Sequence, residues 1–263
     1  NRQGCFRPEQ VLMNAPGVAL ATEWFESWFE SEHYLNLYSH RDKNDALQLI
    51  SFLKETLSLE PGARILDLGC GPGRHSLIFS SEGFTVTGFD LSKRLLEAAT
   101  ETRTREGVDV TLVRGDVRHL PFKAGFDLVM SVFTSWGYFE DDQENFEVLR
   151  QALKLTRESG YFILDLLNPD FLRENIAPAD KVVRNDVTYR VKRQITGNRV
   201  VKTIEFVDKG ELKSFQESVR LYEPEDITEV LEEAGATKIS LYGDYKGGKF
   251  NRQSSPRLIC IAN

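Results

Sequence analysis

Between residues 60 and 170, short apolar runs alternate with segments whose apolar residues recur at helical spacing. The runs are typical of strands buried on both faces of a sheet, and they cover residues 65–68, 84–90, 108–113, 126–133 and 161–167. The helical segments cover residues 44–59, 74–81, 92–104 and 141–160. This alternation predicts an α/β protein with a doubly wound, mostly parallel sheet.

Residues 170–222 depart from that rhythm. Residues 187–195 and 200–206 alternate apolar and polar side chains with a period of two, and Gly197-Asn198 between them is typical of a two-residue hairpin turn. A second turn at residues 208–210 leads into residues 212–221. We therefore expect an antiparallel β insertion after the fifth strand. A helix starting at Glu223 and two strands, residues 237–242 and 257–261, complete the predicted sheet.

The predicted domain organisation has three parts. Residues 1–60 form an N-terminal helical arm or lid, residues 61–169 and 223–263 form the core, and residues 170–222 form an insertion that caps the substrate. Residues 1–20 show no periodicity and predict a loosely packed arm. Residues 23–29 place two pairs of aromatic side chains at i, i+4 on one helical face, which either packs in the core or covers a site.

Composition excludes several classes of protein. The chain has 263 residues, of which 41% are hydrophobic and 28% charged, as in ordinary globular proteins. The net charge of −7 argues against nucleic acid as the main partner, although a local basic patch stays possible. Cys5, Cys70 and Cys260 are too widely spaced for a disulfide framework or metal site, and a cytoplasmic location is expected. No stretch predicts a membrane span, a signal peptide or a metal-ligand set.

A glycine turn follows the first apolar run, with Gly69, Gly71 and Gly73 at alternate positions before a helix. Such a turn lets a ligand approach the backbone and the positive end of the helix dipole. The dinucleotide spacing G-x-G-x-x-G is not met, because Arg74 stands where the third glycine would fall. The carboxylate of Asp67 can hold an amino group, and Asp90, at a strand tip, can accept hydrogen bonds from ribose hydroxyls. These features predict a ribose-bearing ligand with an amino group and no pyrophosphate.

Three stretches carry a family resemblance: residues 65–75, 88–92 and 115–117. They resemble motifs I, post-I and II of the class I S-adenosylmethionine-dependent methyltransferases, and the resemblance covers about residues 60–170 and 224–263. It implies the strand order 3-2-1-4-5-7-6 with strand 7 antiparallel, S-adenosylmethionine as the cofactor and S-adenosylhomocysteine as its product. It also implies that Asp116 accepts a hydrogen bond from the adenine amine.

The expected cofactor-binding residues come from the turn, the strand tips and the N-terminal region. They are Asp67, Gly69, Cys70, Gly71, Gly73, Asp90, Leu91, Asp116, Val117, Ser131, Tyr38 and Arg41. The resemblance implies that Tyr38 and Arg41 cover the methionine end of the cofactor, where Arg41 can pair with a carboxylate. The alternative for Arg41 is a surface salt bridge with Asp42 or Asp45.

The fourth strand ends close to the expected substrate position. Trp136 and Tyr138 follow it and either wall a substrate pocket or belong to the core. The Asn/Asp-Pro-Pro-aromatic run shared by methyltransferases of nucleic-acid bases is missing here, which disfavours a DNA-base substrate. No catalytic residue is distinguished by spacing; the candidate bases are His33, His40, Tyr34 and Tyr138, whereas His75 is expected to be structural.

The resulting hypothesis is methyl transfer from S-adenosylmethionine to a small-molecule acceptor by in-line displacement. One alternative is an RNA or tRNA methyltransferase, because residues 181–202 hold seven Lys or Arg against one acid. Those charges also suit the solvated face of an exposed sheet. Another alternative is a non-catalytic S-adenosylmethionine-binding module, and the glycine spacing disfavours a dehydrogenase. No sequence feature selects the acceptor atom or the oligomeric state.

Overall fold

The structure, a computed structural model, describes residues 23–39 and 43–263. The predicted arm at residues 1–20, with Cys5, and the predicted site residues His40 and Arg41 lie outside the described residues. Nothing in the described part of the chain is a helix long and apolar enough to cross a membrane.

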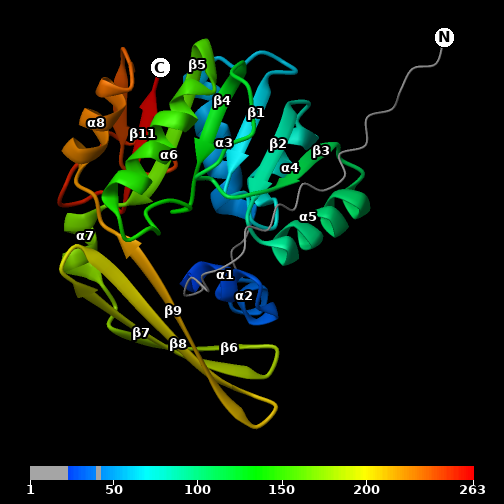
Figure 1. Ribbon diagram of the computed structural model, residues 1–263, viewed down its shortest axis with the longest axis vertical. Coiled ribbons are helices and arrows are strands. Elements are labelled where there is room, and N and C mark those ends of the chain that lie inside the picture. The colour runs from blue at the N-terminus through cyan, green and yellow to red at the C-terminus, as the bar shows by residue number, and fades with distance from the viewer. Residues whose placement is uncertain (1–22, 40–42) are drawn as a thin grey trace, which may run out of the picture.

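A seven-stranded sheet forms the centre of the molecule (Figure 1). Its strands are β1 (Arg64–Leu68), β2 (Thr85–Asp90), β3 (Val110–Arg114), β4 (Phe126–Ser131), β5 (Thr156–Leu167), β10 (Ile239–Tyr242) and β11 (Arg257–Ala262). Their order is β3-β2-β1-β4-β5-β11-β10, and β11 runs antiparallel to both its neighbours. The predicted fold class and strand order are therefore confirmed.

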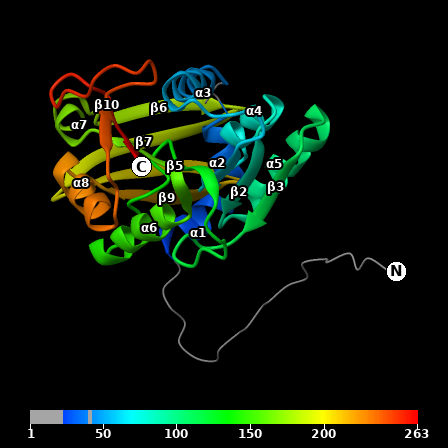
Figure 2. The same cartoon turned by 90° about the horizontal axis from the view of Figure 1, so that it is seen from above.

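Helices cover both faces of this sheet (Figure 2). On one face lie α3 (Lys43–Leu57) and α4 (Arg74–Ser81), with α5 (Lys93–Glu106) beside α4. On the other face lie α6 (Asp142–Lys154) and α8 (Pro224–Glu233). Each helix turns its apolar stripe towards the sheet, so the central strands are buried on both faces, as their continuous apolar sequence predicts.

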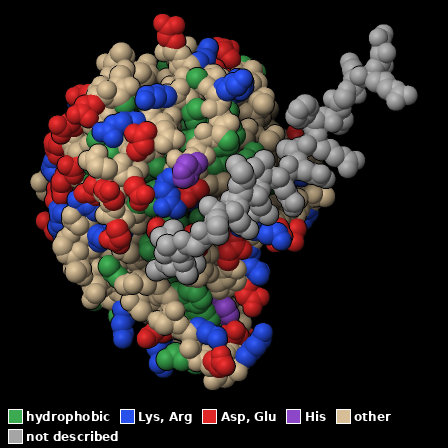
Figure 3. Space-filling view, viewed as in Figure 1, with side chains coloured by type: hydrophobic (Ala, Val, Ile, Leu, Met, Phe, Trp, Pro, Cys, Tyr) green, Lys and Arg blue, Asp and Glu red, His purple; other side chains and the backbone are tan. Residues whose placement is uncertain are grey.

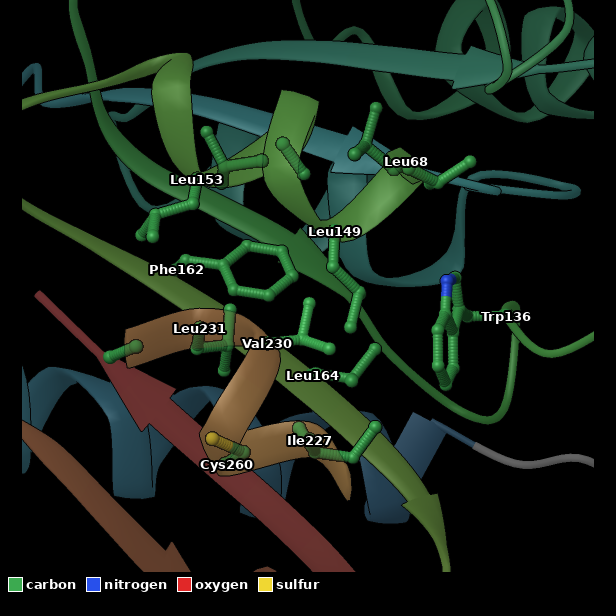
Figure 4. Close-up of a cluster of buried hydrophobic side chains, with 14 of the residues drawn as sticks. Leu68, Trp136, Leu149, Leu153, Phe162, Leu164, Ile227, Val230, Leu231 and Cys260 are labelled. Atoms are coloured by element: carbon green, nitrogen blue, oxygen red, sulfur yellow. The ribbon is translucent and has the colours of Figure 1, made fainter. Parts of the chain in front are cut away.

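The core on the second face shows this packing directly (Figure 4). Phe162 of β5 lies between Leu149 and Leu153 of α6 and Leu231 of α8, and all four side chains are buried. Burying one side chain of this size stabilises the fold by roughly 1.5–3 kcal/mol, so this layer holds α6 and α8 against β5.

The predicted insertion is a separate four-stranded antiparallel sheet, ordered β6-β7-β8-β9. The helix α7 (Pro169–Asn175) leads from β5 into this sheet. Its strands are β6 (Ala179–Arg184), β7 (Val187–Thr196), β8 (Arg199–Asp208) and β9 (Glu211–Arg220). The hairpin turn at Gly197, with φ of +57°, lies where the sequence predicts it. The sequence analysis missed α7 and β6; β6 is exposed over most of its length and therefore lacks an apolar alternation.

The inner face of this second sheet is divided into two regions. At one end Tyr189, Val191, Ile204 and Phe206 pack against two short helices, α1 (Trp24–Phe29) and α2 (Glu32–Leu37). These helices lie between the two sheets (Figure 1). At the other end, the side chains that point to the same face include polar ones, and they border a cavity described below.

Ion pairs and hydrogen bonds tie the insertion to the core. The guanidinium of Arg220 donates to both carboxylate oxygens of Asp142 at 2.8 and 2.9 Å. Arg199 donates to the carbonyl oxygens of Tyr138 and Phe139 at 2.9 and 3.0 Å. The second sheet is thus held against the loop that follows β4.

Two predicted boundaries are wrong. The helix expected to run to Gly160 ends at Lys154, and β5 begins at Thr156, which pairs with Phe126 before a register shift. Gly160 lies inside the strand, where a Cβ atom would meet the Phe126 carbonyl oxygen at 2.8 Å, so glycine is needed for close approach rather than for a helix end.

Candidate functional site

The glycine turn after β1 has the backbone conformation that its sequence predicts. Gly69, Gly71 and Gly73 all have positive φ, at +71°, +56° and +79°. A Cβ atom on Gly69 would come within 2.6 Å of the Ser135 Cβ, so the loop after β4 lies directly against the turn. A Cβ atom on Gly71 would meet only Leu95, at 3.9 Å, so one side of the turn is left open.

Asp90 at the tip of β2 organises this turn. Its carboxylate accepts hydrogen bonds from the backbone N–H groups of Gly71 at 2.7 Å and Ser92 at 2.8 Å. Burial raises the pKa of Asp90, while these two N–H groups favour its charged form and limit the rise. A carboxylate offers about four acceptor positions, so Asp90 can still accept hydrogen bonds from a ligand.

A cavity lies beside Asp90, and several of the predicted cofactor residues line it. They are Gly69, Gly71, Asp90, Leu91 and Asp116, and Val117 is a sixth. Phe29, Leu95 and Phe139 supply apolar walls, which suit a flat ring. Arg118 donates to both carboxylate oxygens of Asp116. Burial opposes ionisation of Asp116, but these bonds outweigh it and hold the pKa of Asp116 below its usual value.

A larger cavity of about 600 Å³ adjoins the first, and Gly69, Gly71, Ser135, Tyr34 and Tyr138 line both. It extends from the glycine turn to the polar end of the second sheet's inner face. Three more predicted residues line this larger cavity, namely Asp67, Cys70 and Tyr38. The sequence-predicted residues therefore surround two connected spaces at the carboxyl ends of β1–β4, as expected for an open α/β sheet.

Asp67 and Cys70 are both buried in the turn. Asp67 accepts a hydrogen bond from the Ser76 hydroxyl at 2.6 Å, and burial raises the pKa of Asp67 to about 7. Burial also raises the pKa of the Cys70 thiol well above its ordinary value, so the thiol stays protonated and is a poor nucleophile.

Three predicted site residues line neither cavity. Ser131 is buried at the end of β4, and Gly73 caps α4 and touches Leu77 and Ala99. Trp136 is 3% exposed; its indole N–H donates to the Asn145 carbonyl, and its ring packs on Tyr222. Trp136 thus belongs to the core (Figure 4), which was one of its two sequence interpretations. Tyr138 lines both cavities and donates its hydroxyl hydrogen to the Thr134 carbonyl.

The candidate bases separate clearly by position. His33 bonds through Nδ1 to the Tyr189 hydroxyl at 3.0 Å and packs on Phe206, so it lies in the apolar cluster under α2 and lines neither cavity. His75 lines the larger cavity, but burial lowers the pKa of His75 to about 3 and keeps the ring neutral. Tyr34 and Tyr138 line both cavities.

Sequence reasoning counted Arg193 and Lys202 among the basic residues of the insertion but missed Glu217 beside them on the second sheet. Arg193, Lys202 and Glu217 lie side by side on β7, β8 and β9 and line the larger cavity. Glu217 accepts hydrogen bonds from the indole N–H of Trp28 at 2.7 Å and the hydroxyl of Tyr38 at 2.6 Å. The period-two alternation marks these positions, but only the assembled fold shows which face is covered.

The basic residues of the insertion do not form one patch. Lys181, Arg190 and Lys192 are exposed, whereas Arg193 and Lys202 face the larger cavity. On the face seen in Figure 3, acidic side chains gather over α6 and α8. The solvated-face interpretation therefore fits the first group, and the second group belongs to the site.

The loop after β4 carries backbone strain. Phe133 and Thr134 have φ of +63° and +64°, a conformation that is costly for side chains of this size. The Phe133 N–H donates to the Asp165 carboxylate at 2.7 Å, and the Thr134 N–H donates to the Asp165 carbonyl at 3.0 Å. Both strained residues line the larger cavity, so Asp165 fixes part of its wall.

Comparisons with known proteins agree with this architecture. A family model described as a methyltransferase domain matches residues 65–160, from β1 into β5. A Geobacillus protein named as a methyltransferase is 30% identical over 103 residues, 39% of this chain and 42% of that protein. The glycine/sarcosine N-methyltransferase of Aphanothece halophytica is 24% identical over 238 residues, 82% of this chain and 86% of that protein. Residues 65–160 form a class I S-adenosylmethionine-dependent methyltransferase domain.

The fold of this methyltransferase family extends over the whole described chain. The solved structure of the sugar N-methyltransferase KedS8 from a Streptoalloteichus species superimposes with a TM-score of 0.67 at 16% identity. The match covers 97% of this chain and 99% of KedS8, so the fold it shares includes the second sheet. This chain spans less than half the length of the Geobacillus relative.

S-adenosylmethionine is the cofactor of this family, and the site fits it. The open side of Gly71 and the acceptor positions of Asp90 suit a ribose with a close backbone approach. The apolar walls around Leu91 and Val117 suit a purine. The space beyond Gly69 continues towards the second sheet, so a ligand bound in the first cavity can reach an acceptor in the second.

Proposed function

We propose that this protein transfers a methyl group from S-adenosylmethionine to a small-molecule acceptor, and that the acceptor atom is an amine nitrogen. The observation that carries the proposal is the pair of connected cavities. One is bounded by the strand tips that carry the cofactor motifs, and the other lies between those tips and the second sheet. A concave space of about 600 Å³ suits a small molecule better than a polymer.

In this proposal the smaller cavity holds the nucleoside part of the cofactor. Asp90 accepts hydrogen bonds from the ribose hydroxyls, and Asp116 accepts one from the adenine amine. Leu91 and Val117 pack against the base, and Gly69 and Gly71 allow the backbone to approach it. Asp67 and Tyr38, which line the larger cavity, face the amino-acid part.

The insertion, residues 170–222, serves as the cap over the acceptor, and the helices within residues 1–60 close its side. Two contacts support this division of labour. Glu217 of the second sheet accepts hydrogen bonds from both Trp28 and Tyr38, so the sheet and the N-terminal helices form one wall. Arg199 joins the same sheet to Tyr138 beside the glycine turn.

When bound, S-adenosylmethionine supplies a sulfonium methyl group that a nucleophile can take by in-line displacement. The protein's task is to hold the acceptor in line, about 3 Å away and shielded from water, which can supply roughly 7–11 kcal/mol. The strained Phe133 and Thr134 wall, fixed by Asp165, gives that space a defined shape. Tyr34 and Tyr138, which line both cavities, are the candidates to take a proton from the acceptor.

The choice of nitrogen rests on the relatives. The relatives compared above include a glycine/sarcosine N-methyltransferase and a sugar N-methyltransferase.

Calorimetric titration with S-adenosylhomocysteine, with NAD as the control, tests the cofactor assignment. We expect micromolar binding of the first ligand and none of the second. A turnover screen then compares small primary and secondary amines with phenols and with transfer RNA. Binding without turnover on any acceptor would favour a non-catalytic module, and a steep salt dependence of RNA binding would favour an RNA substrate.

A further inference from the structure

Arg257, the first residue of β11, lies at the wall of the larger cavity. Because β11 runs antiparallel to β5, its first residue lies at the edge where the parallel strands end (Figure 1). The Arg257 Nε donates to Asp165 Oδ1 at 2.7 Å, and Nη2 donates to the Thr134 hydroxyl at 2.9 Å and to the Asp165 carbonyl at 3.3 Å. Asp165 is fully buried, so these bonds hold the guanidinium in one orientation.

The third nitrogen of this guanidinium is different. Nη1 donates to no group among residues 23–39 and 43–263. It is also not one of the fully buried side-chain atoms without a hydrogen-bond partner, so it is accessible from the cavity. The Arg257 side chain is 16% exposed and lines the cavity. Two N–H donors on a fixed, otherwise buried guanidinium therefore face the space where the proposed acceptor binds.

The surroundings of Nη1 suit an anionic group. A second guanidinium, that of Arg74, lies over the Phe133 ring at 4.2 Å from its centre, and Arg257 lies over the same ring at 5.8 Å. Both arginines line the cavity. The carboxylate of Asp165 is occupied by Arg257, Phe133 and the Tyr245 hydroxyl, so it is turned away from a ligand. A planar guanidinium with free donors is well suited to a carboxylate.

The strand order places this group on the acceptor side of the site. Asp90, the proposed ribose ligand, is on β2, and β1, β4 and β5 lie between β2 and β11. Neighbouring strands are about 4.8 Å apart, so the two strands are separated by roughly 20 Å. The Arg257 side chain reaches back to Thr134 after β4, beyond the glycine turn as seen from Asp90.

We propose that Arg257 binds a carboxylate of the methyl acceptor through Nη1, so that the acceptor is a small acid carrying an amine. This proposal rests on the proposed function. Asp165 and Thr134 act as positioning residues, because they orient the guanidinium without touching the ligand.

Matched pairs of ligands test the proposal without knowledge of the natural acceptor. The probes are glycine with methylamine, sarcosine with dimethylamine, and β-alanine with ethylamine, where each pair differs by one carboxylate. They are titrated into the full chain saturated with S-adenosylhomocysteine. We expect at least one acid to bind tenfold or more tightly than its decarboxylated partner. That preference should fall below threefold in Arg257→Lys, which keeps the positive charge, and in Arg257→Gln.

Three results would overturn the proposal. In the first, all pairs bind equally or not at all, and in the second the preference survives in both variants. In the third, the variants no longer bind S-adenosylhomocysteine but still bind its decarboxylated analogue. That result would assign Nη1 to the carboxylate of the cofactor itself. The exposed Arg190→Gln, at a position that lines neither cavity, is the matched control, and thermal unfolding reports whether each variant folds. If neither variant folds, equal affinities within the wild-type pairs still overturn the proposal. Failure of the proposed function is separate, because it appears as wild-type protein that does not bind S-adenosylhomocysteine.

Discussion

The carboxylate of Asp90 accepts a hydrogen bond from the backbone N–H of Gly71 at 2.7 Å, which joins the tip of β2 to the glycine turn after β1. The same carboxylate accepts from Ser92 at the start of α5. One side chain thereby fixes three segments that surround the proposed cofactor site, and a ligand bound to Asp90 meets an already formed turn.

Replacing Asp90 with alanine should weaken cofactor binding. The change removes a charged hydrogen-bond acceptor for the ribose and leaves the Gly71 N–H without its partner, so we expect a loss of about 1–3 kcal/mol. This corresponds to roughly 5- to 150-fold in the Kd for S-adenosylhomocysteine, measured by calorimetry. Asp109→Ala, an exposed aspartate before β3, is the control. Unchanged affinity in Asp90→Ala would remove Asp90 from the site.

Two glycines with the same backbone conformation allow a matched comparison at the turn. Gly71 and Gly197 have φ of +56° and +57°, and alanine at either position carries a similar conformational cost of about 1 kcal/mol. Gly197 lies in the β7–β8 hairpin with nothing near its Cβ position, whereas Gly71 lines both cavities. We expect similar losses of unfolding free energy, but loss of S-adenosylhomocysteine binding only in Gly71→Ala. Equal affinities in the two variants would contradict a close backbone approach of the ligand.

Glu217 should control how firmly the N-terminal helices are held. In Glu217→Ala the buried indole N–H of Trp28 and the hydroxyl of Tyr38 lose their shared acceptor. An unsatisfied buried donor costs about 1–3 kcal/mol, so residues 24–38 should exchange amide hydrogen faster while the core strands do not. Hydrogen exchange followed by mass spectrometry measures this, with Glu211→Ala at an exposed hairpin as the control. Uniform acceleration across β1 and β5 would show a global effect instead.

His75 should make the protein sensitive to acid. Its folded-state pKa is about 3, below the ordinary value of 6.5, because burial disfavours the charged ring. A depressed pKa means that the stabilisation is complete above pH 6.5 and is lost as the pH falls towards 3, by on the order of 4 kcal/mol. Urea unfolding at several pH values should show a shallower acid dependence in His75→Gln than in the wild type. The exposed His119→Gln should keep the wild-type dependence, and an unchanged slope in His75→Gln would refute this assignment.

The core and the cofactor turn could be predicted because local sequence decides them. The apolar side chains of Ile65, Leu66 and Leu68 cover both faces of the strand, and Gly69 and Gly71 have positive φ. A short stretch of sequence therefore determines both features. Ser92, a residue type that favours the N-cap position, caps the helix that follows β2, and its hydroxyl accepts from the Leu95 N–H at 3.1 Å. The shared properties of the resembled family supplied the strand order, which local patterns leave undetermined.

The acceptor side of the site could not be read in the same way. Arg257 bonds to Asp165 across two neighbouring strands that are far apart in sequence, and Glu217 of the second sheet lines the same cavity as Arg257 only because the two sheets face each other. The role of Trp136 was equally open in the sequence, because an aromatic residue near a strand tip suits both a pocket wall and a core. Its contact with Tyr222, from a later segment, places it in the core. Gly160 suits a helix end when only the sequence is considered. Its place inside β5 depends on the close Phe126 carbonyl of the neighbouring strand, which the sequence does not reveal.

Under the proposed function, the way the second sheet joins the core bears on how the acceptor changes over evolution. The insertion lies between β5 and α8 in the sequence. None of its strands pairs by backbone hydrogen bonds with a strand of the seven-stranded sheet. Its cavity-facing positions, Val200, Lys202, Glu217 and Val219, form two adjacent rows of cross-strand neighbours. Substitutions there reshape the acceptor space while Asp90, Gly71 and Asp116 stay untouched. Selection can therefore exchange one acceptor for another in a lineage that keeps the same methyl donor.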